Sequence, residues 1–489
     1  MSATTTNTPK PDLSKKRNII FIHPDLGIGG AERLIIDAAV GLQNLGHRVT
    51  ILTSHCDPKH CFEEARDGTL DVRIRGHTIF PPAILNRFHI LLATFRQIHL
   101  VLATCLFTNE LAELKPEVFI IDQLSACVPL LRWLWPRNER VLFYCHFPDQ
   151  LLARRDEQGW LGIVKRVYRW PFDWFEGWSM GGSDRVVVNS RFTRSVVEKV
   201  FGRDRLGELR VVYPCVNIES GQREEQDEKP LWKNKKILLS INRFERKKDV
   251  GLAIKAFAGL TLEQRPNVRL VIAGGYDSRI SENVLYHKEL EALADYLGLS
   301  HATAKNVPTA LAVPFSIDVL FLLSVPGVFK STLLRNAKLL IYTPQNEHFG
   351  IVPVEAMQYG VPVLASNTGG PLETVLDGKT GWLRDAKDVG AWTDVMSQVV
   401  NDADGVEIQM MGQAGKKRVQ GEFSRTKMSH MLEDQIEEMI RGRRKAFVER
   451  KDVIFVLSVI GIFVAALFLT LMSIPDLSRP PRKHIQLNN

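Results

Sequence analysis

Apolar and polar segments alternate along the chain in an order typical of parallel α/β proteins. The run NIIFIHPDL, residues 18–26, predicts a buried strand, and the glycine-rich stretch after it, residues 27–47, leads into an amphipathic helix. RVTILTSH, residues 48–55, predicts a second strand, so the chain begins with the strand–helix–strand unit of Rossmann-like sheets. Later strands of this half are predicted at PEVFIID (116–122), RVLFYC (140–145) and DRVVV (184–188), and LRVVYPCV (209–216) closes the half.

The same pattern starts again after a polar interruption. Residues 219–230 lack apolar side chains, and we expect 219–235 to link two domains. The predicted fold is therefore α/β, with Rossmann-like domains at 18–218 and 236–440 that face each other across a cleft. Strands of the second domain are predicted at KKILLSIN (235–242), VRLVIAGG (268–275), LLIYTP (339–344) and VPVLAS (361–366).

The two ends of the chain differ from these domains. Residues 1–17 are polar, contain no signal-peptide core and predict a disordered tail. Residues 453–474, VIFVLSVIGIFVAALFLTLMSI, carry no charge and are long enough for a transmembrane helix. The basic segment 441–452 precedes them, and the short tail 475–489 carries fewer Lys and Arg residues. This asymmetry predicts that both domains lie in the cytosol.

Composition limits the classes of partner. The 489-residue chain is 45% hydrophobic and 24% charged, as expected of a globular protein, and its net charge of +8 favours anionic partners such as a diphosphate or a membrane surface. No array of basic and aromatic residues indicates nucleic acid. The 6 Cys residues do not form the dense pattern of a disulfide scaffold, which favours buried thiols in a reducing compartment.

Two segments of the first half suit a membrane surface. Residues 83–107 are strongly apolar, but interspersed Arg and His residues make a transmembrane span costly. An amphipathic helix in the plane of a membrane and a buried core helix are both compatible with this pattern. Residues 159–178 combine Trp with Arg and Lys, which fits a membrane–water interface or a lipid-linked acceptor, and equally a rim of core aromatics.

The richest candidate chemistry lies in residues 339–373. A polar loop after the strand LLIYTP carries Glu347, and the helix predicted near Pro353 carries Glu355 in its first turn. The pair Gly369–Gly370 opens the loop after the next strand. Both loops leave the carboxyl ends of parallel strands, where such sheets bind ligands. The helix start can hold a phosphate, and the two carboxylates can bind sugar hydroxyls.

Further candidates follow other strands. Arg243 and Lys248 lie in one loop, and two cations aimed at a diphosphate stabilise a leaving nucleotide without a metal. His146 and Asp149 follow the strand RVLFYC. The glycine loop GIGGAE does not spell G-x-G-x-x-G, which argues against a dinucleotide site and leaves a loop that a substrate approaches closely.

Two groups of residues resemble metal motifs only weakly. The spacing of His55, Cys56, His60 and Cys61 matches no standard zinc pattern. Asp402 and Asp404 spell D-x-D, but they follow a predicted helix rather than a strand. We therefore expect chemistry without a metal or another cofactor.

The string NEHFGIVPVEAM resembles the E-x(7)-E element of retaining glycosyltransferases of family 4, which have the GT-B fold. The resemblance implies that Glu347 contacts the transferred sugar, that Glu355 binds the nucleotide ribose, and that the R-x(4)-K pair holds the diphosphate. It implies catalytic roles for Glu347, His146, Lys248 and Arg243. The implied donor-binding set is Arg243, Lys248, Glu347, His348, Phe349, Gly350, Ile351, Val352 and Glu355, and the implied acceptor side is Gly29, Gly30, His146 and Asp149.

The segments GIGGAERL, D-Q-x-S-A-C, YCHFPD and VNS-x-FT extend the resemblance to dolichol-pathway mannosyltransferases, over roughly residues 18–440. This implies transfer of the second and third mannoses, α1,3 and α1,6, from GDP-mannose to a dolichyl-diphosphate-linked oligosaccharide at the cytosolic face of the endoplasmic reticulum membrane. Other mannosyltransferases of that pathway are candidate protein partners. A different lipid-linked acceptor is the alternative, and a non-catalytic scaffold would leave the Arg243, Lys248, Glu347 and Glu355 set unexplained. Residues 324–338 depart from the pattern and receive no function.

Overall fold

The computed structural model describes residues 15–76, 79–80, 89–152, 172–218, 231–232, 235–402 and 405–445, and the single residues 454, 458 and 461. Within these ranges no helix is both long and apolar enough to cross a membrane. The transmembrane helix expected at 453–474 lies almost entirely outside the described residues. So do most of the expected N-terminal tail, the 219–230 part of the linker and the tail 475–489.

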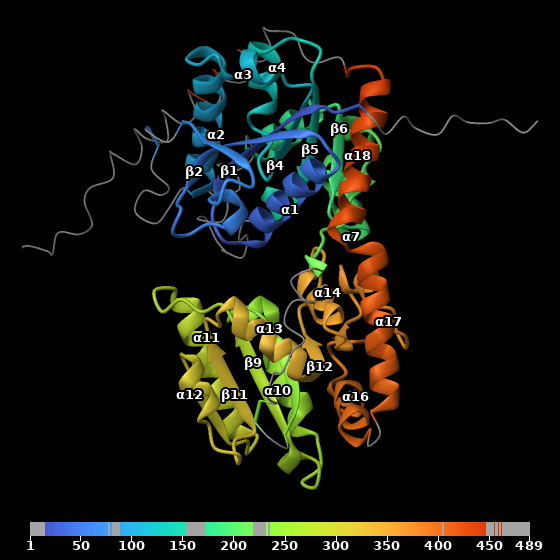
Figure 1. Ribbon diagram of the computed structural model, residues 1–489. Helices are drawn as coiled ribbons and strands as arrows, with labels where there is room; N and C mark the ends of the chain where they lie inside the picture. Colours follow the sequence, from blue (N-terminus) through green and yellow to red (C-terminus); the bar gives the residue numbers. More distant parts are fainter. Residues whose placement is uncertain are drawn as a thin grey trace, which may run out of the picture.

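The first domain is built on a seven-stranded sheet in the order β3-β2-β1-β4-β5-β6-β7 (Figure 1). Every pairing is parallel. Phe21 of β1 lies opposite Ile51 of β2 and Ile120 of β4, so the strand predicted first is central to the sheet. Its strands are β1 (Asn18–Leu26), β2 (Arg48–Cys56), β3 (Asp71–Ile74), β4 (Val118–Asp122), β5 (Arg140–Cys145), β6 (Arg185–Val188) and β7 (Arg210–Val211).

Helices cover both faces of this sheet, which is why its central strands are apolar on both sides. The longer helices are α1 (Gly30–Asn44), α2 (His89–Leu106) and α7 (Arg191–Phe201), and the shorter ones are α3 (Glu110–Leu114), α4 (Val128–Leu134), α5 (Asp149–Leu152) and α8 (Arg203–Leu206). A further helical stretch occupies residues 172–181.

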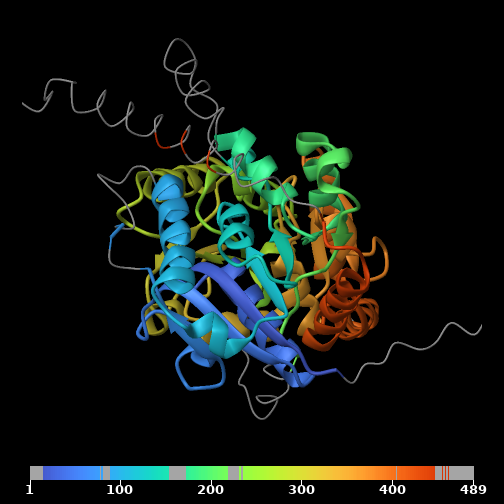
Figure 2. The ribbon, with the colours of Figure 1, turned by 90° about the horizontal axis from the view of Figure 1, so that it is seen from above.

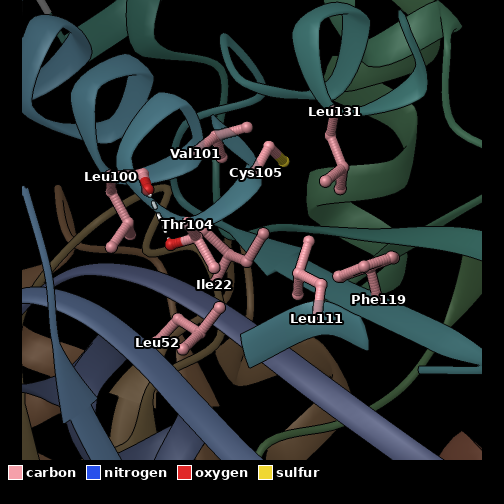
Figure 3. A pocket seen from close by; sticks show the side chains of 9 residues that line it. All are labelled: Ile22, Leu52, Leu100, Val101, Thr104, Cys105, Leu111, Phe119 and Leu131. Atoms are coloured by element: carbon pink, nitrogen blue, oxygen red, sulfur yellow. Dashed lines mark hydrogen bonds between the residues drawn. The ribbon is translucent and has the colours of Figure 1, made fainter. Parts of the chain in front are cut away.

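The helix α2 is the described part of the apolar segment 83–107 and shows how that part packs. Leu100 and Val101 are buried in the core between α2 and the sheet, which confirms the core-helix alternative for this face. A cavity of ≈ 10 Å³ lies between them and the strands (Figure 3), about the space of one water molecule, so it cannot hold an acyl chain. The end of the helix differs, since Leu106 and Phe107 are exposed.

The second domain repeats the architecture with a seven-stranded parallel sheet in the order β10-β11-β9-β8-β12-β13-β14. Its strands are β8 (Lys236–Ile241), β9 (Val268–Gly274), β10 (His301–Ala304), β11 (Val319–Leu323), β12 (Ala337–Tyr342), β13 (Val363–Ser366) and β14 (Gly381–Arg384). Its helices are the 3-10 turn η2 (Arg246–Lys248), α10 (Gly251–Ala258), α11 (Ser281–Tyr296), α12 (Val307–Leu311), α13 (Gly327–Asn336), α14 (Ile351–Gln358), α15 (Pro371–Thr374), α16 (Val389–Asn401) and α17 (Val406–Glu422).

The last described helix, α18 (Arg425–Arg441), returns to the first domain (Figure 1). Its apolar residues Met428, Leu432 and Ile436 belong to the same core cluster as α1 and the first sheet. Residues 425–440 were expected in the second domain, and by packing they belong to the first. The adjoining backbone docks there too, since the Lys445 N–H donates to Asp184 Oδ1 over 2.9 Å.

Candidate active site

The loop after β12 holds Glu347 in a fixed position. Its carboxylate forms an ion pair with Lys248 and accepts a hydrogen bond from the Tyr342 hydroxyl over 3.2 Å. Its backbone carbonyl accepts the Gly370 N–H over 2.7 Å, which ties this loop to the loop after β13. Glu347 is therefore positioned by the strand that leads into its loop and by two segments more distant in sequence.

The glycine pair is required by this close approach of two backbones. A Cβ on Gly369 would lie 2.7 Å from the Glu347 N and O atoms, and the φ of Gly369 is +70°. A Cβ on Gly370 would overlap with the Phe349 carbonyl. Larger residues at either position would push the Glu347 loop away from the loop after β13.

Lys248 ends η2 and reaches Glu347 from the loop after β8. Its own carbonyl accepts the Thr343 hydroxyl over 2.6 Å, which fixes the loop against β12. Burial alone would raise the pKa of Glu347, but Lys248 outweighs it and the pKa of this carboxyl lies below its usual value. Glu347 is thus a carboxylate at neutral pH, ready to accept hydrogen bonds from sugar hydroxyls.

Arg243 lies in the same loop as Lys248 but is much more open. Its guanidinium is 65% exposed and pairs with Glu245 over 3.1 Å. Its side chain packs over Gly275, where an added Cβ would lie 3.3 Å from the Arg243 Cγ. Arg243 is therefore free to turn towards an anionic ligand, whereas Lys248 is already engaged.

Glu355 lies on α14, in its second turn rather than the first turn that was expected. Its carboxylate pairs with Lys330 Nζ over 2.6 Å. Lys330 belongs to α13, within the segment 324–338 that had no assigned role. This segment thus supplies a cation to one of the two predicted donor carboxylates.

The start of α14 presents free backbone donors. Gly350 is its N-cap, with a φ of +82° that suits glycine, and Ile351 and Val352 follow as its first residues. The N–H groups of a first helical turn have no intrahelical partner and attract anions. Phe349, buried against Tyr213, anchors the turn.

His348 joins the two domains. Its ring stacks on Phe147 of the first domain, with centroids 3.7 Å apart, and its carbonyl accepts the Ser190 hydroxyl over 2.5 Å. Burial lowers the pKa of His348 to about 4, although Glu347 opposes the shift, so the ring is neutral at physiological pH. The loop after β12, residues 343–350, which is predicted to bind the donor and is called the donor loop below, therefore rests on residues that follow β5 and β6.

A second bridge joins the domains at Glu373 of α15. Its carboxylate accepts the backbone N–H groups of Arg191 and Phe192 at the start of α7, over 2.9 and 2.8 Å, and the Tyr213 hydroxyl over 3.0 Å. The VNS-x-FT segment thus contacts both loops of the second domain.

His146 lies at the end of β5, beside Phe147 and the donor loop. Its Nε2 hydrogen-bonds Asp122 over 3.1 Å, and its carbonyl accepts the Asn189 amide over 2.9 Å. The other oxygen of Asp122 bonds His23 over 2.8 Å. Sequence analysis did not assign His23 or Asp122, although each lies near the carboxyl end of a predicted strand.

The other residues predicted for the acceptor side occupy the same edge of the first sheet. Gly29 is the N-cap of α1 and Gly30 its first residue. Asp149 begins α5, where its N–H donates to Glu176 over 2.7 Å. The structure places the Gly29–Gly30 loop and Asp149 after the ends of strands, but it does not bring them into contact with Glu347.

In the described part of the chain no group of three or more His, Cys, Asp or Glu side chains is placed to hold a metal ion. Cys56 and Cys61 are buried free thiols, as are Cys127, Cys145 and Cys215. Asp402 follows α16, as expected, and Asp404 lies outside the described residues.

Comparison with known proteins decides the family. A model described as Glycosyltransferase Family 4 matches residues 28–220, and one described as Glycosyl transferases group 1 matches residues 222–418. Alpha-1,3/1,6-mannosyltransferase alg-2 of Neurospora crassa is 55% identical over 440 residues, 88% of this chain and 92% of that protein. The chain belongs to the alpha-1,3/1,6-mannosyltransferase family. Its Schizosaccharomyces pombe member is 47% identical over 430 residues, 87% of this chain and 81% of that protein.

Solved structures place this mannosyltransferase family member in the GT-B fold. Sucrose-phosphate synthase from Thermosynechococcus elongatus superposes with a TM-score of 0.63 at 18% identity, covering 86% of this chain and 99% of that one. Anabaena Alr3699/HepE, solved in complex with UDP and glucose, gives 0.60 at 17%, with the same coverage. At these identities the likeness concerns the fold alone.

Proposed function

We propose that the protein is a retaining mannosyltransferase that adds the second and third mannoses, in α1,3 and α1,6 linkage, from GDP-mannose to dolichyl-diphosphate-linked Man-GlcNAc2. The observation that carries the proposal is the 55% identity to alpha-1,3/1,6-mannosyltransferase alg-2 along nearly the whole of both chains. The Lys248–Glu347 pair supports it, since a non-catalytic scaffold has no need of a carboxylate held beside a lysine in a part-buried pocket of the loops, with side chains 20% and 13% exposed.

On the donor side, Glu347 orients the mannose and Glu355 binds the ribose. Arg243, Lys248 and the first N–H groups of α14 stabilise the negative charge that develops on the departing GDP. These charges are supplied by the chain itself, so we propose that no metal is needed. Among the described residues of the site, Glu347 and Glu355 are both paired with lysines, so neither is a carboxylate dedicated to covalent attack. This favours attack by the acceptor hydroxyl on the same face of the sugar that GDP leaves.

On the acceptor side, His146, Asp149 and the Gly29–Gly30 loop lie at the carboxyl edge of the first sheet. We propose that the lipid-linked sugar enters here, with its lipid at the endoplasmic reticulum membrane and both domains on the cytosolic face. The apolar segment 453–474 would provide the anchor. Residues 442–445 dock on the first domain beside Arg140 and Asp184, at the amino ends of β5 and β6, so this segment leaves the domain at the edge of the sheet opposite the acceptor side.

Purified protein with GDP-mannose, UDP-glucose or UDP-N-acetylglucosamine, and synthetic lipid-linked Man-GlcNAc2, tests the proposed reaction. We expect two added hexoses with GDP-mannose alone, identified by mass spectrometry and by linkage-specific mannosidases. Transfer only to a different lipid-linked acceptor would favour the alternative glycosyltransferase, and absence of transfer to any acceptor would refute both.

The anchor has its own test. Deleting residues 453–489 should release the protein from carbonate-washed membranes, because no other segment is proposed to span the bilayer. A truncated chain that still sediments with those membranes would contradict the single anchor and point to the exposed end of α2 or the Trp-rich segment.

A further inference from the structure

Three ionisable side chains meet behind the predicted acceptor side. They come from three neighbouring strands: His23 from β1, Asp122 from the end of β4, and His146 from the residue after β5. The side chains of His23 and Asp122 are 0% and 1% exposed, and that of His146 is 20% exposed. A single buried carboxylate thus separates a buried imidazole from one that reaches the surface.

The hydrogen bonds determine where the protons lie. His23 Nε2 faces the Asp25 carbonyl over 3.1 Å, and a carbonyl only accepts, so Nε2 carries a proton. His23 Nδ1 faces Asp122 Oδ1 over 2.8 Å. Two proton placements satisfy this contact, an imidazolium beside a carboxylate or a neutral imidazole beside a protonated carboxyl.

The directions of the pKa shifts favour the charged pair. Burial by itself would lower the pKa of His23, but the charge of Asp122 outweighs it and the pKa is raised. Burial would raise the pKa of Asp122, but the two imidazoles outweigh it and the pKa is lowered. In either placement Oδ2 of Asp122 remains an acceptor, so His146 Nε2, 3.1 Å away, must be the donor.

His146 Nδ1 is then the atom left for substrate. No described residue bonds it, and it is not among the enclosed polar atoms that lack a partner, so it is open to solvent. The adjoining Phe147 ring stacks on His348 of the donor loop, which places His146 beside the site of the transferred sugar.

We propose that Asp122 and His23 are positioning residues that hold His146 with its proton on Nε2 and thereby present Nδ1 as a hydrogen-bond acceptor for a hydroxyl of the transferred hexose. This inference rests on the proposed function. It gives a role to the D-Q-x-S-A-C segment, whose aspartate is Asp122, and to His23.

The first experiment compares two replacements of the ring itself. In His146→Asn the amide oxygen occupies nearly the position of Nδ1 and accepts a hydrogen bond. His146→Gln instead places its terminal amide near Nε2 and leaves the Nδ1 position empty. We expect His146→Asn to keep about two- to tenfold more kcat than His146→Gln, because the net contribution of one hydrogen bond corresponds to about that factor. The reverse order would overturn the proposal.

The second experiment compares two replacements of Asp122. An asparagine can donate its amide N–H to Nδ1 of a neutral His23 and accept from His146 Nε2, so every hydrogen bond is kept and the pair remains neutral overall. Asp122→Asn should therefore stay within about fivefold of wild-type kcat. Asp122→Leu, which removes the acceptor, should lose about 10²-fold in kcat with little change in the KM for GDP-mannose.

Each result is assigned to one hypothesis. Melting temperatures of all four variants show whether a loss follows unfolding, and if Asp122→Leu does not fold, the His146 pair decides. Asp122→Asn as inactive as Asp122→Leu in a folded protein would show that the charge, not the proton position, matters, and would refute the proposal. An inactive wild type would instead refute the mannosyltransferase function, so the two failures are distinguishable.

Discussion

Lys248→Ala compared with Lys247→Ala is the most discriminating substitution at the donor side. The two lysines are adjacent, but Lys248 is 13% exposed and pairs with Glu347, whereas Lys247 is 66% exposed and pairs with Glu245 over 3.1 Å. An exposed pair contributes about 0.2–1 kcal/mol, so Lys247→Ala should retain at least about a fifth of the activity. Removing a buried electrostatic contact at a transition state costs about 3–4 kcal/mol, so Lys248→Ala should lose about 10²–10³-fold.

The assay is the initial rate of GDP release and of lipid-linked product formation at saturating acceptor, with the melting temperature of each variant as a control. A pH series adds a second readout. Without Lys248, only His348 and the Tyr342 hydroxyl oppose the effect of burial, which raises the pKa of Glu347, so the acid limb of the activity profile should move to higher pH than in the wild type. Equal rates for the two variants, in folded proteins, would refute the assignment of Lys248 to the donor site.

Three further predictions concern other residues. Lys330→Ala should raise the KM for GDP-mannose by up to about fivefold, because the pair that Lys330 forms with Glu355 is about one-third exposed. The control Lys338→Ala, at an exposed position, should leave the KM unchanged. Equal KM values for the two variants would remove Lys330 from the donor site. Glu347→Ala should abolish the α1,3 and the α1,6 product together, as measured by mass spectrometry with linkage-specific mannosidases, and a variant that still makes one linkage at the wild-type rate would exclude a single site. Burial raises the pKa of the Glu176 carboxyl from 4.5 to about 7, so the folded state binds this proton more tightly than the unfolded chain, and the free energy of unfolding should fall as pH rises from about 5 to about 7. Urea unfolding of Glu176→Gln should lack this fall. The same fall in the variant would contradict the assignment to Glu176.

Local sequence determined most of the strands and one half of the site. Apolar runs bounded by Gly, Pro and polar residues identified β1, β2, β4, β5 and β6 in the first sheet and β8, β9, β12 and β13 in the second. The segments β3, β10, β11 and β14 were missed. β3, β10 and β14 are four-residue strands at the edges of their sheets and are only partly buried, so their apolar pattern is weak. β11 is a buried apolar run, VLFLL, whose strand signal was overlooked. Glu347, Glu355 and the glycine pair were found because the strand–loop–helix unit that positions them is continuous in sequence.

Only the tertiary structure decided which distant groups meet. Lys248 and Glu347 are 99 residues apart, and His23 and Asp122 are also 99 apart, so their contacts depend on the order of the strands in each sheet. The same holds for α18, whose amphipathic pattern gives one apolar face but not the domain that covers it. Apolar periodicity reports which face of an element is buried, because burial acts on each residue. It carries no information on the partner across the core, because the hydrophobic effect has no direction, and only the assembled sheet supplies that choice.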